Sequence, residues 1–251
     1  MKIVAITQAR ISSTRLPGKV MKKIKNKPLL QYHIDQILKS KLINEVVVAT
    51  SKKKEDNLIY DYCTKKKIQC YRGSLKDVLS RYYYCAKKYK ADIIVRVTSD
   101  CPLIDPKIID KCLKLYLKKN YDYVSNTNPP QNATYPDGTD VEIFDYPKLE
   151  YAFNNCKNKL FREHVTYFFW KNPKKFKVFR LNLNRNLRMF RLTVDYKEDF
   201  LLIKEILTNF INNNTKITLN NIIYFLTKNK KTKSINNIRN SDLKKNYNEN
   251  L

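Results

Sequence analysis

Short apolar runs alternate with amphipathic segments along the first half of the chain. The runs are compact, β-branched and bounded by polar residues, which predicts buried strands. They cover residues 3–6, 45–50, 68–71 and 93–98. The segments between them have apolar residues at helical spacing and cover residues 29–38, 55–66 and a helix that begins near Asp77. Because strand and helix alternate, we expect an α/β fold whose parallel strands are joined by right-handed crossovers.

From Tyr121 the pattern becomes less regular. Strands are predicted at 121–125, 176–183 and 191–195, and a turn around Gly138 leads into an alternating strand that ends at Phe144. Helices are predicted at 148–154, 198–210 and 218–227, with another that opens at Arg162. No repeat or Gly/Ser linker interrupts the sequence, so we expect one domain over residues 1–228. Residues 229–251 form a basic, Asn-rich tail that we expect to be partly disordered.

The first predicted strand runs into a loop that is rich in cations and hydroxyl groups. Arg10, Arg15 and Lys19 follow the strand closely, around a Leu-Pro-Gly turn. Open α/β folds bind their ligands at the carboxyl edge of the sheet. Guanidinium forks and a lysine charge suit a polyphosphate at that edge. We therefore interpret the segment as a phosphate-binding loop, and a solvated basic loop is the alternative.

A carboxylate follows the predicted strand at 93–98. Asp100 would lie at the same sheet edge as the cationic loop, with its turn stiffened by Pro102. Carboxylates are the protein ligands that Mg²⁺ prefers. We interpret Asp100 as a metal ligand, the alternative being an N-cap or turn residue, which is how we interpret Asp105. His33, within the first predicted helix, is interpreted as a structural residue.

The net charge of +27 invites a nucleic-acid interpretation. Lysines, however, are spread over the whole length, without a clustered cationic helix or an aromatic–basic stripe. The six cysteines show neither a CxxC pair nor zinc spacing, which is typical of buried thiols in a reducing compartment. No signal-like start or membrane-length apolar run is present. We expect a cytoplasmic protein with no nucleic-acid or membrane partner.

Five motifs together resemble the cytidylyltransferases of the spore coat polysaccharide biosynthesis F type, and more distantly the synthetases of CMP-activated KDO and acylneuraminate sugars. The motifs are QARISSTRLPGK, VRVTSDCPLIDP, PDGTDVEIF, REHVT and TVDYKEDF. They occur in family order and span most of the chain. The last one departs from the family pattern Thr-Val-Asp-Thr-Pro-Glu-Asp at Tyr196 and Lys197, and keeps Asp195, Glu198 and Asp199.

The resemblance implies a Rossmann-like nucleotidyltransferase fold, a mostly parallel mixed sheet flanked by helices, usually in a homodimer. It also implies transfer of CMP from CTP with release of pyrophosphate, with Mg²⁺ as the cofactor. The catalytic residues would be Arg15, Lys19 and Asp100, and the two metal-binding aspartates would be Asp100 and Asp195. The nucleotide-binding residues would be Gln8, Ala9, Arg10, Ser13, Arg15, Lys19, Gly73, Asp77, Arg81 and Thr98.

Acceptor binding and dimerisation are expected from about residues 121–195. The candidate acceptor-binding residues combine carboxylates for hydroxyl groups with cations for a substrate carboxylate or phosphate. They are Asp137, Asp140, Glu142, Arg162, His164 and Arg191. The acceptor is expected to be an acidic sugar or a phosphorylated small molecule used for surface polysaccharide or glycoconjugate precursors. A glycosyltransferase of the same fold that uses a nucleotide sugar is the alternative, and a basic nucleic-acid-binding module is a third hypothesis.

Overall fold

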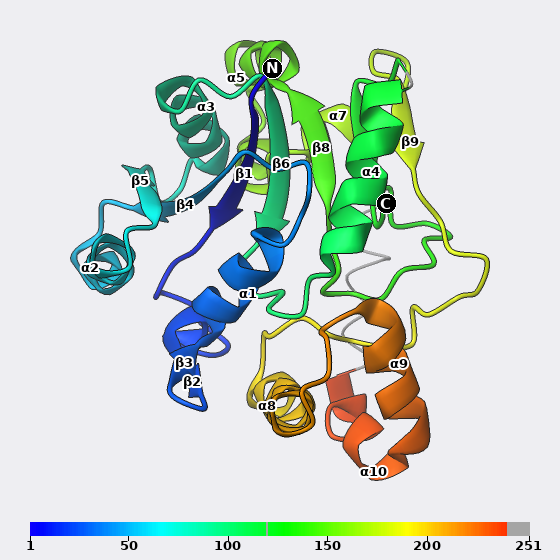
Figure 1. Ribbon diagram of the computed structural model, residues 1–251. Coiled ribbons are helices and arrows are strands. Elements are labelled where there is room, and N and C mark those ends of the chain that lie inside the picture. Colours follow the sequence, from blue (N-terminus) through cyan, green and yellow to red (C-terminus); the bar gives the residue numbers. More distant parts are fainter. Residues whose placement is uncertain (119, 240–251) are drawn as a thin grey trace.

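The computed structural model describes residues 1–118 and 120–239, and its centre is a mostly parallel β-sheet (Figure 1). Within these residues the sheet has seven strands in the order β5-β4-β1-β6-β8-β7-β9. The strands are β1 (Ile3–Gln8), β4 (Glu45–Ser51), β5 (Gln69–Gly73), β6 (Ile93–Thr98), β7 (Tyr123–Ser125), β8 (Glu142–Asp145) and β9 (Val178–Arg180). A separate hairpin pairs β2 (Lys23–Ile24) with β3 (Lys27–Pro28). Strands β5, β4, β1 and β6 are parallel, and β8 is antiparallel to both β6 and β7.

Helices cover both faces of the sheet, as the alternation of strand and helix predicts. They are α1 (Leu29–Ile37), α2 (Asn57–Lys65), α3 (Val78–Lys88), α4 (Pro106–Lys118), α5 (Tyr146–Asn155), α6 (Lys159–His164), α7 (Tyr167–Trp170), α8 (Lys197–Asn212), α9 (Leu219–Lys228) and α10 (Lys230–Lys233). Three short 3₁₀ turns complete the described elements: η1 (Lys19–Met21), η2 (Lys54–Asp56) and η3 (Asn237–Arg239). The predicted α/β class and the mostly parallel mixed sheet are confirmed.

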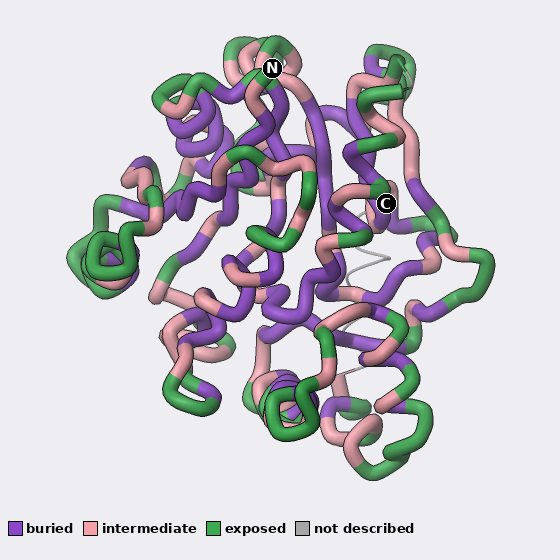
Figure 2. The backbone as a smooth tube through the Cα atoms, viewed as in Figure 1, coloured by how far each residue is buried: buried purple, intermediate pink, exposed green. Residues whose placement is uncertain are grey.

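Side chains of alternate residues in the central strands enter two hydrophobic cores, one on each face of the sheet. Ile3 and Ala5 of β1 pack with α1, α2, α4, α8 and α9, whereas Val4 and Ile6 pack with α3, α5 and α7. Figure 2 shows the buried central strands and the exposed outer faces of the helices. Parallel strands buried on both faces explain why the sequence shows continuous apolar runs there rather than alternation.

Helices α8, α9 and α10 gather on the side toward which β1 and β6 run (Figure 1). This arrangement brings residues 191–199 opposite the loop after β1, although the two segments are far apart in the sequence. Gly138 permits one close approach there, because its φ is +91° and an added Cβ would lie 2.2 Å from the backbone nitrogen of Thr193. The region of the predicted acceptor loop is therefore packed tightly against the segment that contains Asp195.

Two local predictions are wrong. Residues 191–195 do not form a strand, because only Asp137 and Arg191 pair there, as an isolated bridge. Arg162 lies near the end of α6 rather than at the start of a helix, so His164 is at a helix C-terminus. Helix α3 begins next to Asp77 as predicted, and Asp77 caps it, because its side chain accepts the Ser80 N–H at 3.0 Å.

Of the tail expected from residue 229, the described part is folded. Residues Lys230–Lys233 form α10 and Asn237–Arg239 form η3. Residues 240–251 lie outside the described residues. None of the helices in the described part of the chain is long and apolar enough to cross a membrane.

Candidate active site

A polar cavity of about 300 Å³ lies at the carboxyl ends of β1 and β6. Its wall combines the loop after β1, the end of β6, the first turns of α3, the end of α6 and the segment before α8. It is lined by Gln8, Ala9, Arg10, Ser13, Thr14, Arg15, Lys19, Val20, Val78, Arg81, Arg96, Thr98, Ser99, Asp100, Glu163, His164 and Asp195. Most of the predicted nucleotide-binding residues and both predicted metal-binding aspartates therefore converge on one cavity.

A buried carboxylate fixes the cationic loop that follows β1. Asp56, at the end of η2, accepts the Ile11 N–H at 2.7 Å and also bonds the Ser51 hydroxyl at the end of β4. Two backbone bonds hold the start and the end of the loop: Ala9 N–H donates to Ala49 O, and Gly18 N–H donates to Ile11 O. The loop is thus tied to the sheet at one end and folded on itself at the other, so its cations face the cavity.

Lys19 lies between the two aspartates. Its Nζ is 2.8 Å from Asp100 Oδ2 and 2.8 Å from Asp195 Oδ1, so the two carboxylates lie within twice that distance of each other. Burial disfavours charge on both partners, but their attraction prevails. The pKa of Lys19 is consequently raised, and the Lys19 ammonium and the Thr98 hydroxyl hold the pKa of Asp100 below its usual value against the effect of burial.

Asp195 is also held on its second oxygen. Arg15 Nη2 lies 3.2 Å and Arg191 Nη2 3.1 Å from Asp195 Oδ2. The Arg191 side chain is 1% exposed and also bonds Asp137 at 2.8 Å and Asp199 at 3.0 Å. Because three carboxylates surround the guanidinium inside the protein, Arg191 cannot meet an acceptor, and that prediction is wrong. Its position instead fixes Asp195.

Two aspartates at one edge of the cavity could hold a metal ion. No three His, Cys, Asp or Glu side chains gather as a metal site in residues 1–118 and 120–239. Mg²⁺, however, usually takes only one or two protein carboxylates and completes its octahedron with water and substrate phosphates. Asp100 and Asp195 fit that donor set, because they already share one cation and face the same space as Arg10 and Arg15.

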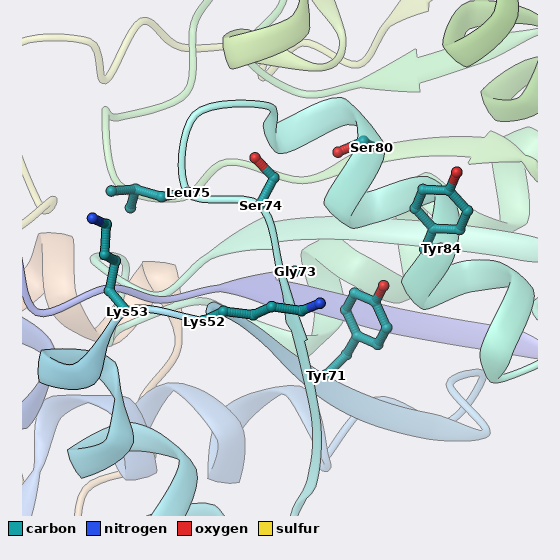
Figure 3. A pocket seen from close by; sticks show the side chains of 8 residues that line it. All are labelled: Lys52, Lys53, Tyr71, Gly73, Ser74, Leu75, Ser80 and Tyr84. Carbon is teal, nitrogen blue, oxygen red and sulfur yellow. The ribbon is translucent and has the colours of Figure 1, made fainter.

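Arg81 and Thr98 line the cavity as predicted, but Gly73 does not. Gly73 borders a separate hollow of about 440 Å³ with Lys52, Tyr71 and Tyr84 (Figure 3). Its missing side chain makes room for Arg81, whose Cγ would lie 2.8 Å from an added Cβ. Gly73 therefore acts on the cavity through the placement of Arg81.

Asp77 and Arg162 pair with each other. Arg162 Nη2 donates to Asp77 Oδ2 at 2.8 Å, and Arg162 also bonds the carbonyl oxygens of Phe153 and Cys156. Both residues line a neighbouring hollow of about 530 Å³, which shares Arg10 and Glu163 with the main cavity. The predicted contacts of Asp77 with the nucleotide and of Arg162 with the acceptor thus stay predictions for an extended site.

Glu142 is buried away from the cavity. Its carboxylate bonds Arg96 and accepts from the hydroxyls of Tyr123 and Thr166, each at 2.6 Å, and from the Asn128 amide. The Glu142 side chain is 1% exposed and these partners all lie inside the protein, so the prediction that it binds the acceptor is wrong. Antiparallel pairing of β6 with β8 places Arg96 directly beside it.

The remaining acceptor candidates lie at or beside the cavity. Asp137 bonds Arg191, and Asp140 accepts the Gly138 N–H at 2.9 Å. Both aspartates are close enough to Asp100 for its negative charge to act on them. Burial and neighbouring carboxylates raise the pKa of both aspartates. His164 lines the cavity and stacks on Tyr167 at 4.3 Å. Burial and Arg96 lower its pKa, which favours a neutral imidazole at neutral pH.

Sequence reasoning missed Arg96, Ser99 and Glu163. Arg96 lies between Val95 and Val97 in a strand that is otherwise largely apolar. A charge in such a run was a signal, since a buried arginine requires a partner of opposite charge. Without the pairing of β6 with β8, the sequence could not identify Glu142 as that partner.

The structural interpretation of His33 is confirmed, and it leads to a pH prediction. His33 is fully buried, with Nε2 2.9 Å from the Thr7 hydroxyl and Nδ1 2.9 Å from Cys101 O. Burial lowers its pKa to about 4 from 6.5. Between these values the unfolded chain binds the proton and the folded one does not. The contribution of His33 to the free energy of unfolding should therefore be fully present above pH 6.5, and the free energy of unfolding should fall by about 3 kcal/mol as the pH drops to 4.

Urea unfolding between pH 4 and 7 measures this loss. In His33→Gln the part of the slope that is due to His33 should disappear, and an unchanged slope would contradict the assignment. His164→Gln, at the only other histidine of the sequence, is the comparison. Because the pKa of His164 is also lowered, this substitution should remove only the part of the slope that is due to His164 and leave the part that is due to His33.

Comparison with known proteins agrees with this geometry. Residues 4–217 match the family model described as Cytidylyltransferase. An uncharacterized protein of Methanocaldococcus jannaschii is 41% identical over 242 residues, which cover 95% of this chain and 96% of that protein. The spore coat polysaccharide biosynthesis protein SpsF of Bacillus subtilis is 29% identical over 208 residues, 80% of this chain and 85% of SpsF. The solved structure of a cytidylyltransferase from Leptospira borgpetersenii superposes with a TM-score of 0.86 at 33% identity, covering 93% of this chain and 97% of that one.

Proposed function

This chain belongs to the cytidylyltransferase family, and we propose that it transfers CMP from CTP to an acidic sugar or a phosphorylated small molecule, with release of pyrophosphate. The product would be an activated precursor of a surface polysaccharide or glycoconjugate, a role suggested by the name of its relative SpsF. As a CTP-consuming enzyme it would act in the cytoplasm. The proposal includes a homodimer, which light scattering of the purified protein tests.

One observation carries the assignment of the reaction centre. Lys19, Asp100 and Asp195 form a single ion-paired group beside Arg15, at the edge of the sheet where α/β folds bind nucleotides. Cations for phosphate oxygens and two carboxylates for a metal ion thus occupy one cavity. A site of this composition suits a triphosphate with Mg²⁺ better than it suits an uncharged ligand.

In the proposed reaction an acceptor oxygen attacks the α-phosphorus of CTP in line with the bond to the β,γ-pyrophosphate. The new phosphorus–oxygen bond forms as the old one breaks, and pyrophosphate leaves with the bonding electron pair. Bound Mg²⁺, held by Asp100 and Asp195, would neutralise charge on the phosphates. Arg10, Arg15 and Lys19 would orient the triphosphate and stabilise the leaving group, so that catalysis rests on positioning and electrostatics.

The acceptor would approach from the side of Asp137 and Asp140. Asp137 is bonded to Arg191 through one oxygen, Oδ2, and its side chain is 25% exposed, which leaves acceptor capacity for a sugar hydroxyl. Arg10 and Arg162 border the adjoining hollow and would attract a carboxylate or phosphate. A neutral His164 on the wall of the cavity could accept the proton of an attacking hydroxyl, and this role stays a proposal.

Release of pyrophosphate tests the proposal. We expect pyrophosphate when the enzyme is incubated with CTP, Mg²⁺ and the correct member of a panel of sugar acids and phosphorylated alcohols. Reactions without acceptor, and with ATP, GTP or UTP in place of CTP, are the controls. A glycosyltransferase of the same fold would consume a nucleotide sugar and release no pyrophosphate from CTP, and that outcome would overturn the proposal.

A further inference from the structure

The folded segment after α9 reaches the reaction centre from outside the region that matches the family model, which ends at residue 217. Helix α10 packs against α8 and α9, and the chain then turns inward at Asn236. Asn236 is 3% exposed in an otherwise basic and polar segment. A buried amide in such a segment needs polar partners inside the protein.

Those partners belong to the group that holds Asp195. Asn236 Nδ2 donates to Asp199 Oδ1 at 2.8 Å and to the backbone oxygen of Arg191 at 3.1 Å. Both partners are acceptors, which fixes the amide with its nitrogen toward them. Asn236 thus contacts both residues through which Asp195 is oriented.

Asp199 connects Asn236 to Asp195 in two ways. Its carboxylate accepts the backbone N–H of Asp195 at 3.1 Å, and it bonds Arg191 Nε at 3.0 Å. Arg191 in turn bonds Asp195 Oδ2. The Asp199 side chain is fully buried, so the loss of a donor there would not be replaced easily by water.

A second contact joins the same segment to Tyr196, a residue that the cationic loop also contacts. The Arg239 guanidinium lies 4.0 Å from the centre of the Tyr196 ring and pairs with Glu198 at 3.2 Å, while Arg15 lies 5.3 Å from the same ring. The C-terminal segment therefore contacts the residues beside Asp195 at two points.

We propose that Asn236 is a positioning residue for metal–nucleotide binding, which orients the Asp195 carboxylate through Asp199 and Arg191. The inference rests on the proposed role of Asp195 in holding Mg²⁺. Residues that orient metal ligands typically contribute 10–100-fold to metal affinity, roughly the range expected for Asn236.

The test measures Mn²⁺ binding to the enzyme–CTP complex by electron paramagnetic resonance, without acceptor. Asn236→Ala should weaken Mn²⁺ binding by about 10-fold or more. Asn236→Asp keeps the shape but donates no N–H and should weaken it at least as much. Asn229→Ala removes a matched amide, which bonds only Phe225 O on the surface of the same segment, and should change binding less than about twofold.

Asp195→Asn distinguishes the metal-binding role of Asp195 from the positioning role of Asn236. If Asp195→Asn binds Mn²⁺ like the parent, the proposed metal role of Asp195 is wrong. If Asp195→Asn loses binding while both Asn236 variants, still folded by circular dichroism, behave like Asn229→Ala, only the positioning role is wrong. Failure of both Asn236 variants to fold would make Asn236 a core residue of the fold and would also overturn the inference.

Discussion

Lys19→Ala should lower the rate of pyrophosphate release from CTP by about 10²–10³-fold, the effect of losing one preorganised donor to a developing charge, roughly 3–4 kcal/mol. In the free protein the same ammonium neutralises Asp100 and Asp195, at 2.8 Å from each. Its removal leaves two carboxylates at one edge of the cavity without their shared cation. We therefore expect Mn²⁺ to bind the variant more tightly than the parent when CTP is absent, although turnover falls.

The opposite directions of these two effects make the prediction specific. A folding defect would lower turnover and metal binding together. Lys23→Ala is the matched control, because Lys23 is an exposed lysine of β2. Turnover of Lys19→Ala within a few-fold of the parent would show that the triphosphate is held elsewhere.

Asp100→Asn should be at least as damaging as Lys19→Ala, about 10³-fold or more in turnover, because it removes one of two anchors of the metal as well as one of the two partners of Lys19. The amide has nearly the same shape as the carboxylate, so packing at the end of β6 should be preserved. Higher Mg²⁺ concentrations should recover part of the activity, since the remaining carboxylate still binds metal weakly.

Pyrophosphate release over a series of Mg²⁺ concentrations measures this effect. Asp61→Asn, an exposed carboxylate on α2, is the control and should retain the activity of the parent. A folded Asp100→Asn protein that turns over CTP at the parent rate would remove Asp100 from the mechanism.

The strand pattern was sufficient to predict the sheet and the convergence of the cationic loop with Asp100. Asp195 was implied only by the family resemblance, because its segment forms no strand that would bring it to this edge. Buried parallel strands require continuous apolar runs, and parallel topology brings their carboxyl ends to one edge. The roles of Arg191 and Glu142 could not be predicted. Both are charged residues in short polar motifs, and only the three-dimensional structure shows that each forms ion pairs inside the protein.

The buried position of Asn236 could not be predicted for a different reason. Composition describes only the average character of a segment, and the basic, Asn-rich tail is polar on average. One amide at the right place is enough to anchor the segment 230–239, because it meets two acceptors that are already buried. No periodicity signals such a contact, since it depends on a single residue.

The tether from Asp56 to the loop after β1 has a consequence for how substrate is captured. Because Ile11 and Ser51 are bonded to one carboxylate, the loop is ordered before any ligand arrives. The entropy of ordering it is then lost during folding rather than during association. CTP should accordingly bind to a loop that is already formed. Its association rate should be set by long-range attraction to a chain of net charge +27, so added salt should lower that rate.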